Sequence, residues 1–304
     1  MTMFVRQGLQ VEKIFADATT GTQHGLASHT LGGRRSKIVL INLMPDKART
    51  ERHFANVFAA SPCGLDLVLV RPATHRAKTT SQSYLERFYC TWNEVRKSDI
   101  DGVIITGAPV ETLPFEDVTY WRELTEIFNE IRARAIPALY ICWAAQAALY
   151  NFHCIPKHML EVKASGIFSQ QVFRHGSSCV AGLGSQFNCP VSRHTETRWS
   201  DIAHVPGLHV AAAGVQTGLC LVEDELNRTW YMFNHLEYGG QTLTREFQRD
   251  FYAGKPVEEP QNLMENTDPG NSNDYSWRDT GTIFFANWIK TFTGSNVEYI
   301  FKNK

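Results

Sequence analysis

Short apolar runs alternate with helical segments over the first half of the chain, and this alternation limits the fold more than any other feature. The predicted strands are residues 37–43, 66–70, 101–106 and 137–141. One helix is predicted over 47–59 and another over 119–134, where apolar side chains recur at the spacing of one helical face. Such alternation is typical of right-handed βαβ units, whose parallel sheet is covered on both faces. We therefore predict an α/β three-layer sandwich with a mostly parallel, flavodoxin-like sheet.

Bulk composition excludes several classes of protein. The 304 residues are 43% hydrophobic and 20% charged, and the formal net charge of −1 gives no general attraction to nucleic acid or to an anionic membrane. The seven cysteines are irregularly spaced and include no CxxC pair, so neither a disulfide framework nor a metal site is expected. No apolar stretch reaches the ~18 residues of a membrane span, and the N-terminus lacks a signal-peptide core, which favours the cytoplasm.

The other segments complete the predicted layout. Residues 1–36 are expected to form an irregular N-terminal arm, and residues 37–304 a single domain. The polar segment 155–200 is interpreted as an insertion that forms part of a pocket. Residues 255–276 are predicted to be a long loop, and residues 282–292 a closing helix.

Three reactive side chains follow predicted strands. The apolar run 136–141 stops at Cys142, and small, helix-favouring residues follow at once, which is typical of a tight strand-to-helix turn that carries a nucleophile. Far downstream, another apolar run ends at His235, with Glu237 two residues later. Ligands bind beyond the carboxyl ends of parallel strands, so we expect these residues and the Gly107–Pro109 turn to converge there. A thiol, an imidazole and a carboxylate at one edge suggest covalent catalysis.

Several motifs occur in the order of a known family. They are Leu43–Glu51, Thr106–Pro109, Cys142–Ala148, Ile155–Lys157, Lys163–Gly166, His235–Tyr238 and Arg249–Asp250. Together they resemble the homoserine O-acyltransferase family, which has the class-I glutamine-amidotransferase-like fold and contains homoserine O-succinyltransferases and their acetyl-using relatives. Two stretches depart from the family's usual pattern. Asn234 and Leu236 stand in a motif that usually reads Gly-His-Pro-Glu-Tyr, and Val191 in one that usually reads Pro-His-Ser-Arg.

The resemblance implies a ping-pong acyl transfer. Cys142 would attack the thioester of an acyl-CoA, and a helix N-terminus with a neighbouring imidazole favours the thiolate that this step needs. His235 would then take the proton of an acceptor hydroxyl, while Glu237 orients the imidazole and stabilises its cation. The backbone N–H groups of Trp143 and Ala108 are the expected donors to the oxyanion. No bound cofactor is expected, since acetyl-CoA is a co-substrate.

The same resemblance assigns substrate contacts. Lys163 matches a position that binds the acyl donor, Ser192 one associated with substrate choice, and Arg249 one where a guanidinium suits the carboxylate of an amino acid. Glu111 matches a position that controls acyl size, with glycine for succinyl and glutamate for acetyl. A second anion ~4 Å from the succinyl carboxylate would cost on the order of 1–4 kcal/mol, so acetyl is predicted. The expected partners are small molecules, and a homodimer is a further family-level expectation.

The predicted function is therefore that of a homoserine O-acetyltransferase in methionine biosynthesis. Serine is an alternative acceptor, because one methylene discriminates by only ~1–3 kcal/mol. Homoserine O-succinyltransferase is the alternative for the acyl donor. A glutamine amidotransferase or amidase would use the same sheet and triad, but Ala144 stands where amidotransferases commonly have glycine. A non-enzymatic binding module is disfavoured by the intact triad.

Overall fold

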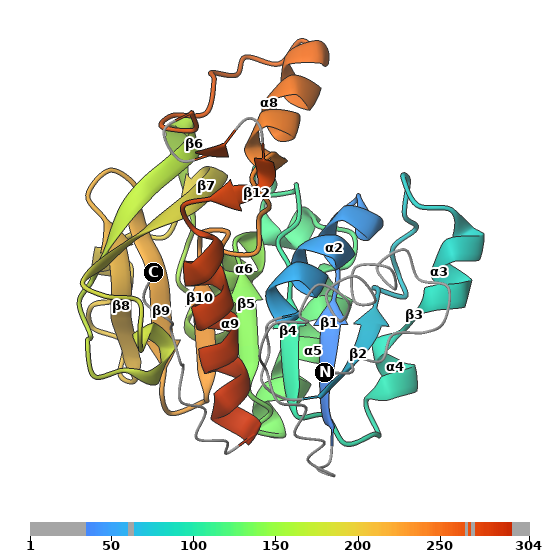
Figure 1. The fold of residues 1–304 in the computed structure, drawn as a ribbon. Coiled ribbons are helices and arrows are strands. Elements are labelled where there is room, and N and C mark those ends of the chain that lie inside the picture. The colour runs from blue at the N-terminus through green and yellow to red at the C-terminus, as the bar shows by residue number, and fades with distance from the viewer. Residues whose placement is uncertain (1–34, 60–63, 265–266, 269–270, 294–304) are drawn as a thin grey trace, which may run out of the picture.

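A ten-stranded sheet with helices on both faces forms the centre of the protein (Figure 1). The structure, a computed structural model, describes residues 35–59, 64–264, 267–268 and 271–293. The strands of the large sheet are β1 (Ser36–Ile41), β2 (Leu65–Val70), β3 (Tyr89–Cys90), β4 (Gly102–Ile105), β5 (Ala138–Ile141), β6 (His158–Val172), β7 (Gln186–Glu196), β8 (Leu208–Gly214), β9 (Gly218–Asp224) and β10 (Thr229–Met232). The helices are α2 (Lys47–Phe58), α3 (Gln82–Phe88), α4 (Trp92–Val95), α5 (Trp121–Ala133), α6 (Trp143–His153), α7 (Trp199–Ile202), α8 (Thr242–Tyr252) and α9 (Arg278–Thr293), with 3₁₀ turns η1 (Phe115–Asp117) and η2 (Ser178–Val180).

The order of the strands brings distant segments of the chain together. The sheet runs β3-β2-β1-β4-β5-β10-β9-β8-β6-β7; neighbours from β3 to β10 pair in parallel, and those from β10 to β7 pair antiparallel. Strand β10 lies beside β5, with Met232 opposite Ile141. The backbone N–H of Cys142 extends this pairing by donating to the oxygen of Met232 at 2.7 Å. The ends of β5 and β10 are therefore fixed side by side.

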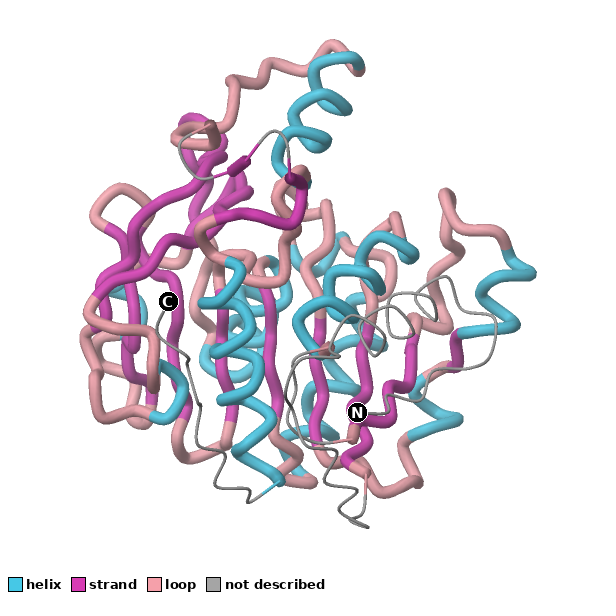
Figure 2. Tube along the Cα trace, in the orientation of Figure 1, coloured by secondary structure: helices cyan, strands magenta, loops and turns pink. Residues whose placement is uncertain are grey.

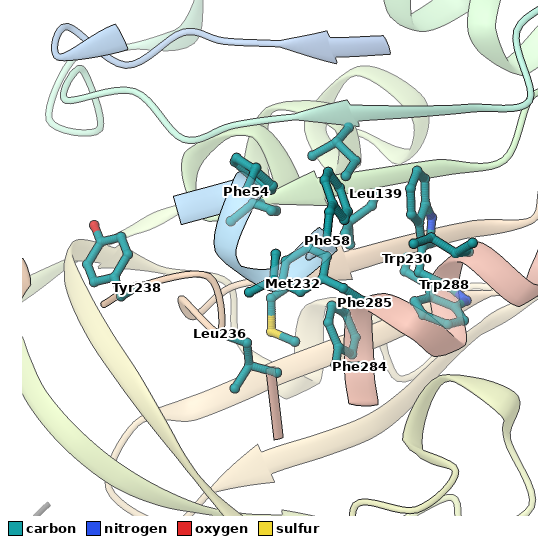
Figure 3. Packing of buried hydrophobic residues seen from close by; sticks show 14 of the residues in the cluster. Phe54, Phe58, Leu139, Trp230, Met232, Leu236, Tyr238, Phe284, Phe285 and Trp288 are labelled. Atoms are coloured by element: carbon teal, nitrogen blue, oxygen red, sulfur yellow. The ribbon is translucent and has the colours of Figure 1, made fainter. Parts of the chain in front are cut away.

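Each face of the central strands meets its own helices. On β1, Ile38 and Leu40 join the apolar cluster under α2 and α9, whereas Val39 and Ile41 join the cluster under α5 and α6. Figure 2 shows these helices on opposite sides of the sheet. Aromatic side chains from α2 and α9 fill the first cluster (Figure 3), namely Phe54, Phe58, Phe284, Phe285 and Trp288. The predicted α/β three-layer sandwich with a mostly parallel sheet is thus confirmed.

Most of the predicted elements in the first half of the chain agree with the structure, because their periodicity reflects burial on one or both faces. The prediction of a loop over residues 255–276 was wrong in part, since β11 (Thr267–Asp268) and β12 (Asn271–Tyr275) pair antiparallel within it. This short pairing joins polar segments, which carry no apolar periodicity. Segment 155–200 contains β6 and β7, which extend the large sheet as an antiparallel pair.

Two further expectations concern the termini and the membrane. Residues 1–34 of the predicted N-terminal arm lie outside the described residues, and the division into an arm and one domain stays a prediction. Among the helices that the structure describes, none has both the length and the apolar character required to cross a bilayer.

Candidate active site

Cys142 occupies a strained turn between β5 and α6. Its backbone angles are φ 54° and ψ −120°, a region that residues other than glycine rarely adopt. It is the N-cap of α6, so the free N–H groups of the first helical turn lie next to the thiol. The side chain is partly exposed. This is the predicted strand-to-helix turn, with the sulfur at the positive end of a helix.

The turn after β4 lies against the same thiol. A Cβ added to Gly107 would lie 3.1 Å from the Cβ and 3.6 Å from the Sγ of Cys142, so a side chain here would crowd the sulfur. Ala108 follows and is buried. Trp143, the first residue of α6, has a backbone N–H that no carbonyl within the helix can accept. The two residues predicted as oxyanion donors therefore flank Cys142 on the two turns that meet there.

His235 and Glu237 follow β10 and are both buried. The Nδ1 of His235 lies 2.7 Å from Oε1 of Glu237, and its backbone N–H donates to the oxygen of Pro190 on β7 at 2.9 Å. Between them, Leu236 is only 1% exposed and packs into the core cluster (Figure 3). Leu236 and Glu237 form a turn in which the N–H of Tyr238 donates to the oxygen of His235 at 3.3 Å, and this turn brings the Glu237 carboxylate back to the imidazole.

The electrostatics of His235 connect it to Cys142. The two side chains lie within electrostatic range of each other. Burial alone would lower the pKa of His235, but the neighbouring Glu237 carboxylate and Cys142 thiolate raise it well above its ordinary value. The ring of Tyr238 stacks on the imidazole with centroids 4.1 Å apart. The arrangement favours an imidazolium held between a thiolate and a carboxylate.

A pocket opens beside His235 and Glu237. Its lining comes from α2, α8 and the turns after β1, β4 and β10, and consists of Met44, Pro45, Asp46, Arg49, Thr50, His53, Phe54, Thr106, Gly107, His235, Glu237, Tyr238, Thr242, Glu246 and Arg249. Glu246 is held from two sides, since the hydroxyl of Tyr238 donates to Oε1 at 2.8 Å and that of Ser192 to Oε2 at 2.7 Å. The pocket thus presents a fixed carboxylate and a guanidinium next to the imidazole.

Of the three predicted substrate-binding residues, Arg249 lines this pocket, whereas Ser192 and Lys163 contact side chains of α8. Ser192 reaches it through its hydrogen bond to Glu246. The Arg249 guanidinium, 54% exposed, pairs with Asp250 through Nε and Nη2 at 3.0 and 2.8 Å. Lys163 also contacts this carboxylate, with its Nζ 3.7 Å from Oδ2, the oxygen that Nη2 of Arg249 binds. These ion pairs hold the pKa of Asp250 well below its usual range despite its burial.

Glu111 is held at the site rather than in solvent. Its Oε2 accepts from the backbone N–H of His194 at 2.9 Å. Burial raises the pKa of Glu111, while the contact with His194 and the nearby charges of Lys163 and His235 oppose that rise. The predicted acyl-size residue therefore lies in electrostatic range of the imidazole and of the predicted donor-binding lysine.

Comparison with known proteins places the chain in a family. The family model described as homoserine O-succinyltransferase matches residues 3–299. This chain belongs to the homoserine O-succinyltransferase family. Over 256 residues it is 44% identical to a protein of Hyphomonas neptunium and 43% identical to one of Allorhizobium ampelinum, both named homoserine O-acetyltransferase. These alignments cover 84% of this chain and 84% and 83% of the relatives. The protein is thus an acyltransferase.

Solved structures confirm the class-I glutamine-amidotransferase-like fold. A glutamine amidotransferase of Thermotoga maritima has a TM-score of 0.58 at 10% identity, with 86% of this chain and 100% of that chain covered. One from Methylobacillus flagellatus has a TM-score of 0.54 at 11% identity, covering 89% and 99%. Identities this low show the fold alone.

Several residues in the site of this homoserine O-succinyltransferase family member had no role in the sequence analysis. Glu246 is one of them. It lies three and four residues before Arg249 and Asp250, the spacing of one helical face, and this spacing was the signal in the sequence that could have identified it as a site residue. His53 lines the pocket, and burial lowers its pKa to about 4, so it is neutral at neutral pH. No local pattern on α2 distinguishes it. Among the described residues, no group of three or more His, Cys, Asp or Glu side chains is arranged to hold a metal ion.

Helix α9 supports the segment that carries His235 and Glu237 in this family member. A Cβ at Gly281 would overlap the backbone oxygen of Leu236. We expect Gly281→Ala to lower the free energy of unfolding by about 1–3 kcal/mol, because one of the two backbones must move. Urea unfolding would measure the effect. The exposed Arg278, one turn earlier, provides the control, and Arg278→Ala should change stability by less than ~0.5 kcal/mol. Equal stability of both variants would show that α9 does not brace this segment.

Proposed function

We propose that this chain is a homoserine O-acetyltransferase that transfers the acetyl group of acetyl-CoA to the hydroxyl of L-homoserine through an acetyl-Cys142 intermediate. The observation that carries the proposal is the position of Cys142 at the start of α6, in electrostatic range of the buried His235–Glu237 couple. The names of the relatives from Hyphomonas neptunium and Allorhizobium ampelinum support the substrates. A place in methionine biosynthesis, a cytoplasmic location and a homodimer belong to the same proposal.

In the first half-reaction, the Cys142 thiolate attacks the thioester carbonyl of acetyl-CoA. A carbon–sulfur bond forms to Cys142 as the bond to the CoA sulfur breaks, and the departing thiolate takes the proton of the His235 imidazolium. The backbone N–H groups of Trp143 and Ala108 would donate to the oxyanion, an interaction typically worth about 3 kcal/mol per donor. One thioester replaces another, so this step is close to isoenergetic.

In the second half-reaction, His235 acts as a base. Acetylation removes the negative charge of Cys142, one of the groups that raise the pKa of His235. The imidazole left neutral by the first step can therefore accept the proton of the acceptor hydroxyl, whose oxygen attacks the acetyl carbon. Collapse of this second intermediate yields the O-acetyl ester and restores the thiolate–imidazolium pair.

The pocket provides groups suited to an amino-acid acceptor. We assign the α-ammonium to Glu246, whose carboxylate is aligned by Tyr238 and Ser192. The α-carboxylate is assigned to Arg249, because the bidentate pair with Asp250 uses Nε and Nη2, and Nη1 provides two further donors. Both residues line the pocket that also contains His235.

Labelling in two steps tests the proposal. The enzyme is mixed with acetyl-CoA alone, and peptide mass spectrometry should find one acetyl group on Cys142. Homoserine, serine and glutamine are then added separately, and homoserine should discharge the label fastest. Faster discharge by serine would reassign the acceptor. Glutaminase activity without any label on Cys142 would reject the acyltransferase in favour of an amidase.

The acyl preference gives a further prediction. Glu111→Gly should raise the succinyl-CoA to acetyl-CoA ratio of kcat/KM by about tenfold or more, because it removes both volume and a charge that repels the succinyl carboxylate by on the order of 1–4 kcal/mol. Steady-state kinetics with both donors measure the ratio. Glu111→Gln keeps the volume and removes the charge, and should recover only part of the change. An unchanged ratio in Glu111→Gly would remove Glu111 from acyl selection.

A further inference from the structure

A buried guanidinium lies near the reacting groups without a carboxylate partner. Arg193 on β7 is only 3% exposed. Its Nη1 donates to Oδ1 of Asn234 at 2.6 Å and its Nη2 donates to the backbone oxygen of Thr217, whereas its Nε has no hydrogen-bond partner. Both of these acceptors are neutral. Buried arginines are ordinarily paired with an anion, so the charge of Arg193 needs another explanation.

Nearby carboxylates are committed elsewhere. Among the described residues, no Asp or Glu oxygen lies within ion-pair distance of Arg193. Glu196 pairs with Arg198 at 3.3 Å, and Glu111 accepts from the backbone of His194. Burial lowers the pKa of Arg193, and among charged groups the Cys142 thiolate opposes that change most.

Two contacts place Arg193 beside the segments that carry the nucleophile and the base. Thr195 lies on the same face of β7, two residues away, and its hydroxyl donates to Gln146 in the first turns of α6 at 2.8 Å. This contact turns the buried face of β7 toward the helix that begins after Cys142. On the other side, the contact with Asn234 joins Arg193 to the residue that precedes His235. The guanidinium therefore contacts the residue next to His235 and lies in electrostatic range of Cys142.

The charge balance of the triad requires such a cation. A thiolate, an imidazolium and the Glu237 carboxylate together carry one net negative charge, and all lie in a mostly buried site. Burial of an uncompensated charge is costly. We propose that Arg193 is a positioning residue that supplies the compensating charge, so that Cys142 is held as the thiolate in the free enzyme. This inference rests on the proposed role of Cys142 as the nucleophile.

The role of Arg193 in this chain includes a contact that the usual family pattern lacks. Asn234 stands where glycine is usual, and its Oδ1 is an acceptor for Arg193. Asn234→Gly would remove this acceptor and leave the guanidinium charge in place. It is therefore a matched control that separates the hydrogen bond from the charge.

The test follows alkylation of Cys142 by iodoacetamide over a pH series, without acetyl-CoA, by peptide mass spectrometry. The rate reports the thiolate. Titratable groups around this thiol are His235, Glu237 and Tyr238 after β10, with Glu111 in range of His235. Because none of these is changed by the substitutions at position 193, a shift of the profile reports the guanidinium. The exposed Cys154 is the internal reference in every sample.

Arg193→Gln keeps hydrogen-bonding capacity but loses the charge, whereas Arg193→Lys keeps the charge. We expect Arg193→Gln to move the midpoint of the Cys142 profile upward by about one pH unit, which lowers the rate at neutral pH by about tenfold. Arg193→Lys and Asn234→Gly should stay within about threefold of the wild type. Equal profiles for wild type and Arg193→Gln would overturn the proposal, as would an equally large shift in Arg193→Lys.

Folding of the variants is measured by thermal unfolding. If Arg193→Gln does not fold, Arg193→Lys decides, since a wild-type midpoint supports the charge role and a tenfold loss contradicts it. Failure of both variants to fold would assign Arg193 to stability alone. Absence of acetyl labelling on wild-type Cys142 would refute the proposed function instead. The alkylation profile needs no acyl donor, so the two failures are distinguishable.

Discussion

Replacing Cys142 with alanine should abolish acetyl labelling and lower kcat by about 10⁴-fold or more, a loss of the size seen when a covalent nucleophile is removed. The described side chains nearby are engaged in other contacts and do not replace it. His235 is held by Glu237 and by the stacked ring of Tyr238, and Glu246 is held by two hydroxyl groups. Direct attack of homoserine on acetyl-CoA would lose the positioning that the thioester intermediate provides. Labelling with acetyl-CoA and steady-state turnover measure the two effects.

The backbone at position 142 allows loss of chemistry to be separated from loss of folding. Glycine adopts φ 54° and ψ −120° without Cβ strain. Cys142→Gly should therefore be inactive yet more stable than Cys142→Ala by about 1 kcal/mol in urea unfolding. Cys154→Ala is the matched cysteine control and should retain wild-type turnover, since Cys154 is exposed at the end of α6. Turnover by Cys142→Ala within tenfold of the wild type would refute a covalent mechanism.

The sequence allowed prediction of those parts of the site that follow buried parallel strands. The runs before Cys142 and His235 are apolar because β5 and β10 lie in the middle of the sheet, and apolar runs indicate such strands. Their convergence follows from the rule that parallel strands end at one edge. The contact of His235 with Glu237 was implied by the family resemblance, and it needs no distant part of the fold because both residues come from one short segment.

The contribution of β7 could not be predicted in the same way. Segment 155–200 is polar, so its strands show no clear alternation of apolar and polar residues. In the structure these strands pair as β6 and β7, and the oxygen of Pro190 on β7 accepts from the N–H of His235. From the sequence alone, Arg193 would be expected to be an exposed surface charge, and only the fold shows that it is buried. His53 and Glu246 line the pocket from α2 and α8, which the fold brings to the turn after β10, and this tertiary effect has no local pattern.

The second large effect is expected at Glu237. Glu237→Gln should lower kcat/KM by about 10²–10⁴-fold while the fold is retained, by analogy with loss of the acidic member of a triad. The 2.7 Å contact between Oε1 and Nδ1 requires a proton on Nδ1 and leaves Nε2 to act as the base. A glutamine amide can donate to Nδ1 and so favour the wrong tautomer. Loss of the carboxylate also removes the charge that raises the pKa of His235 most, so that pKa should fall.

The direction of the pH dependence follows from these two changes. The pKa of His235 is raised in the wild type, so the imidazolium that stabilises the thiolate is present at neutral pH and is lost only as pH rises through that raised value. In Glu237→Gln the imidazolium is lost at lower pH, and thiolate formation at neutral pH is weakened. Acetyl labelling of this variant should recover toward the wild-type rate as pH increases, because the thiol then ionises without an imidazolium. Discharge by homoserine should not recover, since the wrong tautomer persists once the ring is neutral. Stopped-flow labelling and discharge separate the two steps, and parallel recovery of both would show that Glu237 acts through charge alone and not through the orientation of the imidazole.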